Sequence, residues 1–278
     1  MTLVAVWRAG PRLHAIADTR LIRGPGNVLT EHGPKILPLT IICRQNGPQP
    51  GLDVEIARAE VGFAYSGSSL SALSSLALAN TLCSNLLGPT GAPVPSLADV
   101  ALTIANVSLS YMREVGQLSG PAAMFSAVIF GFCLQARTYR AFEIRPHRSA
   151  SDLSVGLVEH NLTLPDQLLT IGSNTELLQE RTRDDRALSR SRGDPEIPTV
   201  MDSPTRALQS IIDQGDNDSV GGTIQQAWVA GPRFRAIAKM LPIEPRPPSP
   251  RNVGLFVLGF DIIDMQTVGS YQIAPLGR

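Results

Sequence analysis

Thr2, directly behind Met1, is the first residue of this sequence that can do chemistry. A threonine hydroxyl is a poor nucleophile until a base takes its proton. When threonine is the first residue of the mature chain, its own α-amine can be that base. Ordinary removal of Met1 would expose Thr2 in this way without a propeptide. A signal peptide and a plain buried edge strand are the two other interpretations of these opening residues.

Residues with the chemistry to support such a nucleophile follow in order. Asp18 ends the second predicted strand, which returns toward the first, so its carboxylate can orient the hydroxyl and amine of Thr2. Lys35 is one of only two lysines in the chain, against 24 basic residues in all. A buried cation beside Thr2 would keep the amine neutral and lower the pKa of the hydroxyl. Gly67 lies between a strand and a helix start, where its N–H can point at a developing oxyanion.

Composition excludes several other functions. The formal net charge of the 278 residues is zero, which argues against a nucleic acid or an anionic membrane as partner. The three cysteines and four histidines form no metal-binding spacing, so we expect neither disulfides nor a zinc site, and a reducing, cytoplasmic location. The cysteines are Cys43, Cys83 and Cys133, and the histidines are His14, His32, His147 and His160.

Neither a signal peptide nor a membrane span is expected. Arg8 interrupts the first apolar run, and no basic region precedes that run. No charged residue occurs between Glu60 and Asp99, but this stretch is rich in Ser and Asn and reaches Gly88–Pro89. Such a composition fits a helix buried in protein better than one in lipid.

Hydrophobic periodicity predicts strands and helices in alternating groups. Strands are predicted at 3–7, 13–19, 36–44, 54–65, 124–135, 138–144, 168–173, 221–230 and 252–263; helices are predicted at 68–87, from 96, from 175 and at 203–213. Ser96 and Asp99 form a capping box, Ser203 caps a helix with Pro204 at its first position, and 184–199 is a loop or frayed helix end. A Pro-rich linker covers 242–251.

This order predicts an α+β fold. Strands that are apolar on both faces need cover on both sides, so two mainly antiparallel sheets should stack between helix pairs in a four-layer αββα sandwich.

The sequence resembles the proteasome β-subunit family of N-terminal-nucleophile hydrolases, and most closely its bacterial HslV-type and Anbu-type branches. The resemblance rests on the N-terminal Thr, on IADTRLIRG with Asp18, on Lys35, and on the small residue and glycine that open a helix at Gly67. It covers roughly residues 2–230, which we take as the hydrolase domain, with 231–278 as a C-terminal extension.

The resemblance implies further site residues. IGSN resembles the family's Ile-Gly-Ser-Gly and would place Ser173 near the amine of Thr2, while NDSVGGTIQ would make Asp218 a supporting aspartate. The sequence departs from the family pattern at Asn174, where a glycine is usual, and at Gly221, where many members have serine.

The resemblance also implies a threonine-type endopeptidase that acts on peptides or unfolded proteins and needs no cofactor. Such enzymes enclose their sites by self-association into a ring or spiral, and a separate ATP-dependent unfoldase is expected. Two alternatives stay open: a catalytically inactive scaffold subunit, and an N-terminal-nucleophile amidase that acts on a small molecule.

Overall fold

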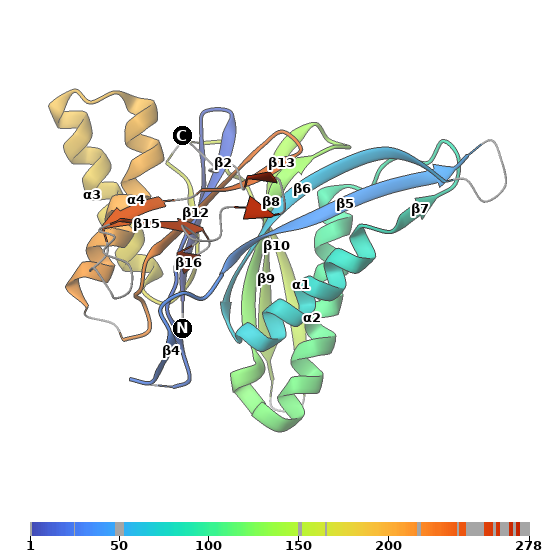
Figure 1. Cartoon of the computed structure of the whole chain (residues 1–278), viewed down its shortest axis with the longest axis horizontal. Helices are drawn as coiled ribbons and strands as arrows, with labels where there is room; N and C mark the ends of the chain where they lie inside the picture. Colours follow the sequence, from blue (N-terminus) through green and yellow to red (C-terminus); the bar gives the residue numbers. More distant parts are fainter. Residues whose placement is uncertain are drawn as a thin grey trace.

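Two stacked sheets, each covered on its outer face by a pair of helices, form the body of the computed structural model (Figure 1). The structure describes residues 2–24, 26–47, 53–149, 152–164, 166–215, 218–237, 239–242, 253–257, 260–261, 267–268 and 271–272. The four layers and the α+β class match the prediction from periodicity.

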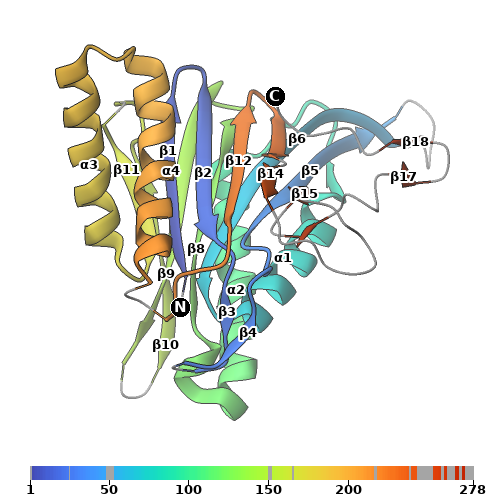
Figure 2. The same ribbon diagram turned by 60° about the vertical axis from the view of Figure 1, so that its left-hand side comes forward.

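The first sheet has the strand order β11-β1-β2-β12-β13, and all its pairs are antiparallel. Its strands are β1 (Leu3–Ala9), β2 (Arg12–Asp18), β11 (Leu168–Gly172), β12 (Ile224–Ala230) and β13 (Arg233–Ile237). Helices α3 (Thr175–Arg192) and α4 (Glu196–Gln214) cover its outer face (Figure 2).

The second sheet has the order β10-β9-β8-β6-β5-β7 and is antiparallel except where β7 joins β5. Its strands are β5 (Ile36–Asn46), β6 (Asp53–Gly67), β7 (Leu86–Gly88), β8 (Phe125–Cys133), β9 (Thr138–Arg148) and β10 (Leu153–His160). Helices α1 (Ser69–Cys83) and α2 (Leu97–Ser119) pack on it.

Short elements complete the chain. They are β3 (Leu21–Ile22), β4 (Val28–Thr30), a 3₁₀ turn at Gly120–Ala123, β14 (Lys239–Pro242), β15 (Val253–Val257), β16 (Phe260–Asp261), β17 (Thr267–Val268) and β18 (Tyr271–Gln272). Most of the predicted Pro-rich linker lies outside the described residues. Because β13 pairs with β12, the first sheet continues past residue 230, while the division into a domain and an extension stays a prediction.

Strand β1 shows how alternation builds two cores at once. Val4 and Val6 pack between the sheets, whereas Leu3, Ala5 and Trp7 pack toward α3 and α4. All five are essentially buried, as a central strand with cover on both faces requires. This burial fixes the register of β1 and therefore the place of Thr2 at its start.

Three helix boundaries differ from the prediction. Helix α3 continues to Arg192, through much of the segment that was predicted as a loop or frayed helix end. Helix α1 ends at Cys83, because Leu86–Gly88 leave the helix and pair in parallel with β5. Helix α4 begins at Glu196, so Pro204 lies inside it. Ser203 is not its cap; the buried Ser203 hydroxyl instead donates to the Thr199 carbonyl one turn earlier, at 2.7 Å. Among the helices that the structure describes, none is long and apolar enough to cross a membrane.

We expect His14 to make the protein acid-sensitive. Its ring stacks on Trp7, and burial, aided by the nearby Arg12 charge, lowers the pKa of His14 from 6.5 to about 4. The unfolded chain therefore takes up the His14 proton first, and the folded state loses stability as the pH falls. From about pH 7 to about pH 4, the loss is about 3 kcal/mol in the free energy of unfolding.

Denaturant melts across this pH range check the expectation. His14→Phe keeps a stacked ring and should remove that part of the acid loss, whereas His147→Phe at an exposed position should leave it in place. An equal acid loss in the wild type and in His14→Phe would contradict the assignment.

Candidate active site

The first sheet brings Thr2 next to residues that are far apart in the sequence. β1 lies between β2 and β11, so the start of β1 faces the end of both neighbours. The Leu3 N–H donates to Asp18 Oδ1 at 2.8 Å, and Leu3 pairs with Gly172 on the other side. Thr2 itself is buried, with 3% of its surface exposed.

Asp18 and Lys35 form a buried ion pair beside this strand end. Lys35 Nζ lies 2.9 Å from Asp18 Oδ2, and both side chains are fully buried. Lys35 Nζ also donates to the Arg20 carbonyl at 2.6 Å. The Asp18 carboxylate accepts N–H groups from Arg20 at 3.3 Å and Gly221 at 3.2 Å. These hydrogen bonds hold the buried pair at a fixed position in the interior.

Burial lowers the pKa of Lys35, and the Asp18 carboxylate opposes that shift. A desolvated lysine gives up its proton more readily than an exposed one. The Lys35 ammonium can therefore serve proton chemistry as well as supply positive potential near Thr2.

Gln225 fixes the backbone that carries this lysine. Its Oε1 accepts from the N–H groups of Lys35 at 2.8 Å and Ile36 at 3.0 Å. Its Nε2 donates to the Gly33 carbonyl at 3.0 Å. Gln225 is buried on β12, so one side chain joins the first sheet to the start of β5 in the second.

The carbonyl of Thr2 is held from two directions. Ser66 Oγ donates to it at 3.1 Å, and the Ser173 N–H donates to it at 2.9 Å. The Ser173 hydroxyl is buried and has no hydrogen-bond partner among the described residues. Asn174 next to it adopts φ 59°, so asparagine takes the left-handed conformation expected at this position.

Gly67 follows Ser66 directly, at the end of β6. Its φ of +115° suits glycine, and a Cβ there would lie 2.6 Å from the Met124 carbonyl oxygen. Of the residues predicted from the sequence, Ser173 contacts Thr2 directly and Lys35 contacts Asp18. Asp18 is linked to Thr2 through its neighbour Leu3, and Gly67 through its neighbour Ser66.

Asp218 is placed differently from the rest. Its side chain is exposed, and its carbonyl accepts from Arg20 Nη1 at 3.2 Å. The loop that carries Asp218 reaches the buried pair through the Gly221 N–H instead. A Cβ on residue 221 would lie 2.3 Å from Arg20 Cζ, so the Arg20 guanidinium occupies the space that a serine at 221 would need.

Ser66, Arg20 and Gln225 also belong to the site, although the sequence does not single them out. A serine before a glycine, or an arginine after Asp-Thr, is common in loops. Only the tertiary contacts single them out. In the described part of the chain, no group of three or more His, Cys, Asp or Glu side chains could hold a metal ion.

Known structures identify the architecture. The structure matches Anbu from Yersinia bercovieri, described as an ancestral β-subunit, at 18% identity over 82% of this chain and 81% of that one, with a TM-score of 0.54. It matches a helical assembly of the Anbu complex from Pseudomonas aeruginosa at 15% identity, 85% and 86% coverage and a TM-score of 0.53. It also matches Anbu from Hyphomicrobium sp. strain MC1 at 17% identity over 85% of this chain and 87% of that one, with a TM-score of 0.51. The chain has the Anbu fold.

At these identities the match concerns the fold alone. No protein-family model matches the sequence, and no curated protein sequence matches it either. The Anbu fold agrees with the proteasome-like architecture expected from the opening residues.

Gly172 makes the tightest approach to Thr2, and we expect Gly172→Ala to disrupt the site. At φ +105°, a Cβ on residue 172 would lie 1.7 Å from the Thr2 carbonyl oxygen and 2.7 Å from Ser66 Oγ. Backbone must therefore move, with a loss of roughly 3 kcal/mol in the free energy of unfolding.

Gly91→Ala is the matched control in a denaturant melt. Gly91 has φ +81° with open space around it, so alanine there adds only conformational strain, about 1 kcal/mol. Equal effects of the two substitutions would show that residue 172 and Thr2 are not in close contact.

Proposed function

We propose that this chain is a threonine-type peptidase of the proteasome kind, with Thr2 as its nucleophile after removal of Met1. The observation that carries the proposal is the fully buried Lys35–Asp18 pair beside the start of β1. The desolvation cost of a buried ion pair can exceed its Coulombic gain, so stability alone is a poor reason for its presence and a role in positioning or chemistry is favoured. The shared Anbu fold supports the proposal at the level of architecture.

In this proposal the Thr2 amine takes the proton of the Thr2 hydroxyl as Oγ1 attacks the peptide carbonyl. The amine then returns the proton to the leaving nitrogen, and water hydrolyses the ester formed on Thr2 by the same steps. The positive potential of Lys35 lowers the pKa of the hydroxyl and disfavours protonation of the amine. The Gly67 N–H stabilises the oxyanion of the tetrahedral intermediate.

Positioning falls to the residues around Thr2. Asp18 pairs with Lys35 and accepts a hydrogen bond from the Leu3 N–H. The Ser66 hydroxyl and the Ser173 N–H donate hydrogen bonds to the Thr2 carbonyl. The unpartnered Ser173 hydroxyl would become the partner of the amine that removal of Met1 creates. Asp218 would support this serine in a substrate-bound enzyme.

We further propose that copies of the chain associate into a ring or spiral that encloses the sites. One of the Anbu relatives forms a helical assembly. Exposed leucines on α1 and α2 suit a contact between copies: Leu70 at 66%, Leu78 at 39%, Leu82 at 42% and Leu102 at 53% exposure. Peptides or unfolded proteins are the proposed substrates, and a separate ATP-dependent unfoldase is the proposed partner.

Hydrolysis assays on the assembled protein test this function. The proposal expects cleavage of fluorogenic peptides and of an unfolded protein, with the cleaved bonds mapped by mass spectrometry. Hydrolysis of small amides without peptide cleavage would establish the amidase alternative. No hydrolysis of either class by a chain with a free Thr2 amine would establish the inactive scaffold.

A further inference from the structure

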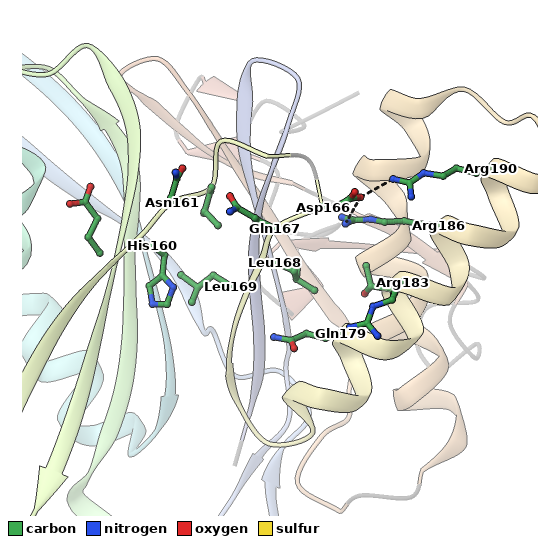
Figure 3. A pocket seen from close by; sticks show the side chains of 13 residues that line it. His160, Asn161, Asp166, Gln167, Leu168, Leu169, Gln179, Arg183, Arg186 and Arg190 are labelled. Atoms are coloured by element: carbon green, nitrogen blue, oxygen red, sulfur yellow. Dashed lines mark hydrogen bonds and ion pairs between the residues drawn. The ribbon is translucent and has the colours of Figure 1, made fainter.

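A polar cavity lies at the other end of β11 from the Thr2 contacts. It has a volume of about 690 Å³, within the usual range for small-molecule sites. The end of β10, the start of β11 and one face of α3 form its walls (Figure 3). Leu169 lines this cavity, whereas Gly172, at the end of the same strand, pairs with Leu3 beside Thr2.

Arginines from successive turns of α3 line this cavity. Arg183, Arg186 and Arg190 are three and four residues apart, so they share one face of the helix. Asp166 on the facing loop lies 2.9 Å from Arg190 Nη2 and 3.5 Å from Arg186 Nη1 (Figure 3). The other carboxylate of the lining, Glu159, is engaged by Arg140 in two hydrogen bonds. Positive charge is therefore in excess at this wall.

Arg186 is the unusual member of the set. Its side chain is only 5% exposed, yet its Nε and Nη2 atoms have no hydrogen-bond partner among the described residues. Burial lowers the pKa of Arg186, but a guanidinium stays charged at neutral pH. Leaving two donors of a buried cation unpaired is costly, which calls for a ligand to satisfy them.

Other arginines of this chain show what the guanidinium edge formed by Nε and Nη2 binds. Arg140, Arg145 and Arg206 each direct Nε and Nη2 together at both oxygens of one carboxylate, respectively Glu159, Glu143 and Asp185. This two-bond geometry fits carboxylates and phosphates. In Arg186 the same edge is buried, and no carboxylate among the described residues pairs with it.

A second orphaned group lies one turn before Arg186. The Thr182 hydroxyl is buried, lines the cavity and has no hydrogen-bond partner within the described residues. Arginine and threonine at this spacing lie on the same helix face and can donate to one oxyanion.

We propose that this cavity binds a small molecule through a carboxylate or phosphate group seated on the Nε–Nη2 edge of Arg186, with Thr182 as a further donor. The site is separate from the proposed peptidase site. Binding and peptide hydrolysis are therefore measured independently, and one can fail without the other.

Calorimetric titration of the assembled protein at constant ionic strength tests the proposal, with pyrophosphate and succinate as the phosphate and carboxylate probes. We expect saturable binding of one of them at one site per chain, and a rise in Tm with its concentration. Arg186→Met should weaken the binding by roughly tenfold or more, because a charge-assisted pair is lost. Arg192→Gln, at an exposed position of α3 outside the lining, should bind as the wild type does.

Measurements without ligand guard against a purely structural effect. Arg186→Met and Thr182→Val remove buried donors that lack hydrogen-bond partners, and Arg190 still pairs with Asp166. Both variants should therefore melt at or above the wild-type temperature while binding more weakly. If Arg186→Met does not fold, Thr182→Val carries the test alone. No saturable binding of either probe, or unchanged binding in the variant that folds, overturns the proposal.

Discussion

Thr2→Ala is expected to abolish peptide hydrolysis while leaving the fold intact. The account assigns the attacking oxygen to the Thr2 hydroxyl, whereas the contacts that hold residue 2 use its carbonyl and the next N–H. Alanine keeps those backbone groups, so we expect a fall in kcat of on the order of a thousandfold or more without a change in Tm. Steady-state hydrolysis of a fluorogenic peptide, with a thermal melt alongside, measures both.

Thr2→Ser is the matched control for that variant. Serine supplies a hydroxyl and an amine in the same place, so part of the activity should remain. Full activity in Thr2→Ala would move the nucleophile to another residue, and equal loss in both variants would point to packing of the threonine methyl group.

Lys35→Met is expected to damage both stability and activity. Without the lysine, the Asp18 charge is buried without a countercharge, which typically costs about 3–5 kcal/mol in the free energy of unfolding. Burial then raises the pKa of Asp18 in the folded state above that of the unfolded chain. Relative to the wild type, this variant should therefore gain stability as the pH falls and lose it as the pH rises.

A second substitution separates the structural role of Lys35 from its chemical role. Asp18→Asn combined with Lys35→Met removes the buried carboxylate charge that the single substitution leaves without a countercharge. The double variant should recover much of the free energy of unfolding but should not recover peptide hydrolysis. Arg58→Met, which breaks an exposed ion pair with Glu55, should change neither quantity appreciably. Denaturant melts and peptide assays of these variants decide the matter, and restored hydrolysis in the double variant would exclude a catalytic role for the lysine.

The pair of sheets could be predicted from the sequence because its central strands are apolar on both faces and so need cover on both sides. In β1, the two valines face one core while Leu3, Ala5 and Trp7 face the other, and this pattern needs no knowledge of the partner strands. The same applies to the neighbourhood of Thr2 and Asp18, since a short hairpin turn must return the second strand to the first. Their contact through Leu3 follows from that local geometry.

Tertiary context decided the elements that the sequence analysis placed wrongly. Pro204 and Ser203 suggest a helix start, but α4 begins earlier and packs on the first sheet. Strand β10 was not predicted, because its residues are only half-buried and it gains its order by pairing with β9. The segment around Arg186 was interpreted as a loop or frayed end, although α3 continues through it to Arg192. Its arginine-lined cavity therefore left no signal in the sequence.

Close contacts between segments that are distant in the sequence could not be predicted from the sequence either. The glycine at 221 was noted as a departure from the family pattern, and the structure explains it by the Arg20 guanidinium that fills the space. Asp218 illustrates the opposite case, because the motif suggested a supporting side chain and the structure leaves that side chain exposed. Its role stays a prediction.

The intact mass of the purified chain before and after exposure to a peptide epoxyketone tests the central claim most directly. That reagent needs a free α-amine and its neighbouring hydroxyl, which together define an N-terminal threonine nucleophile. The account predicts a chain that lacks Met1 and gains the mass of one inhibitor, with no gain in Thr2→Ala. A chain that retains Met1 and stays unmodified would contradict it.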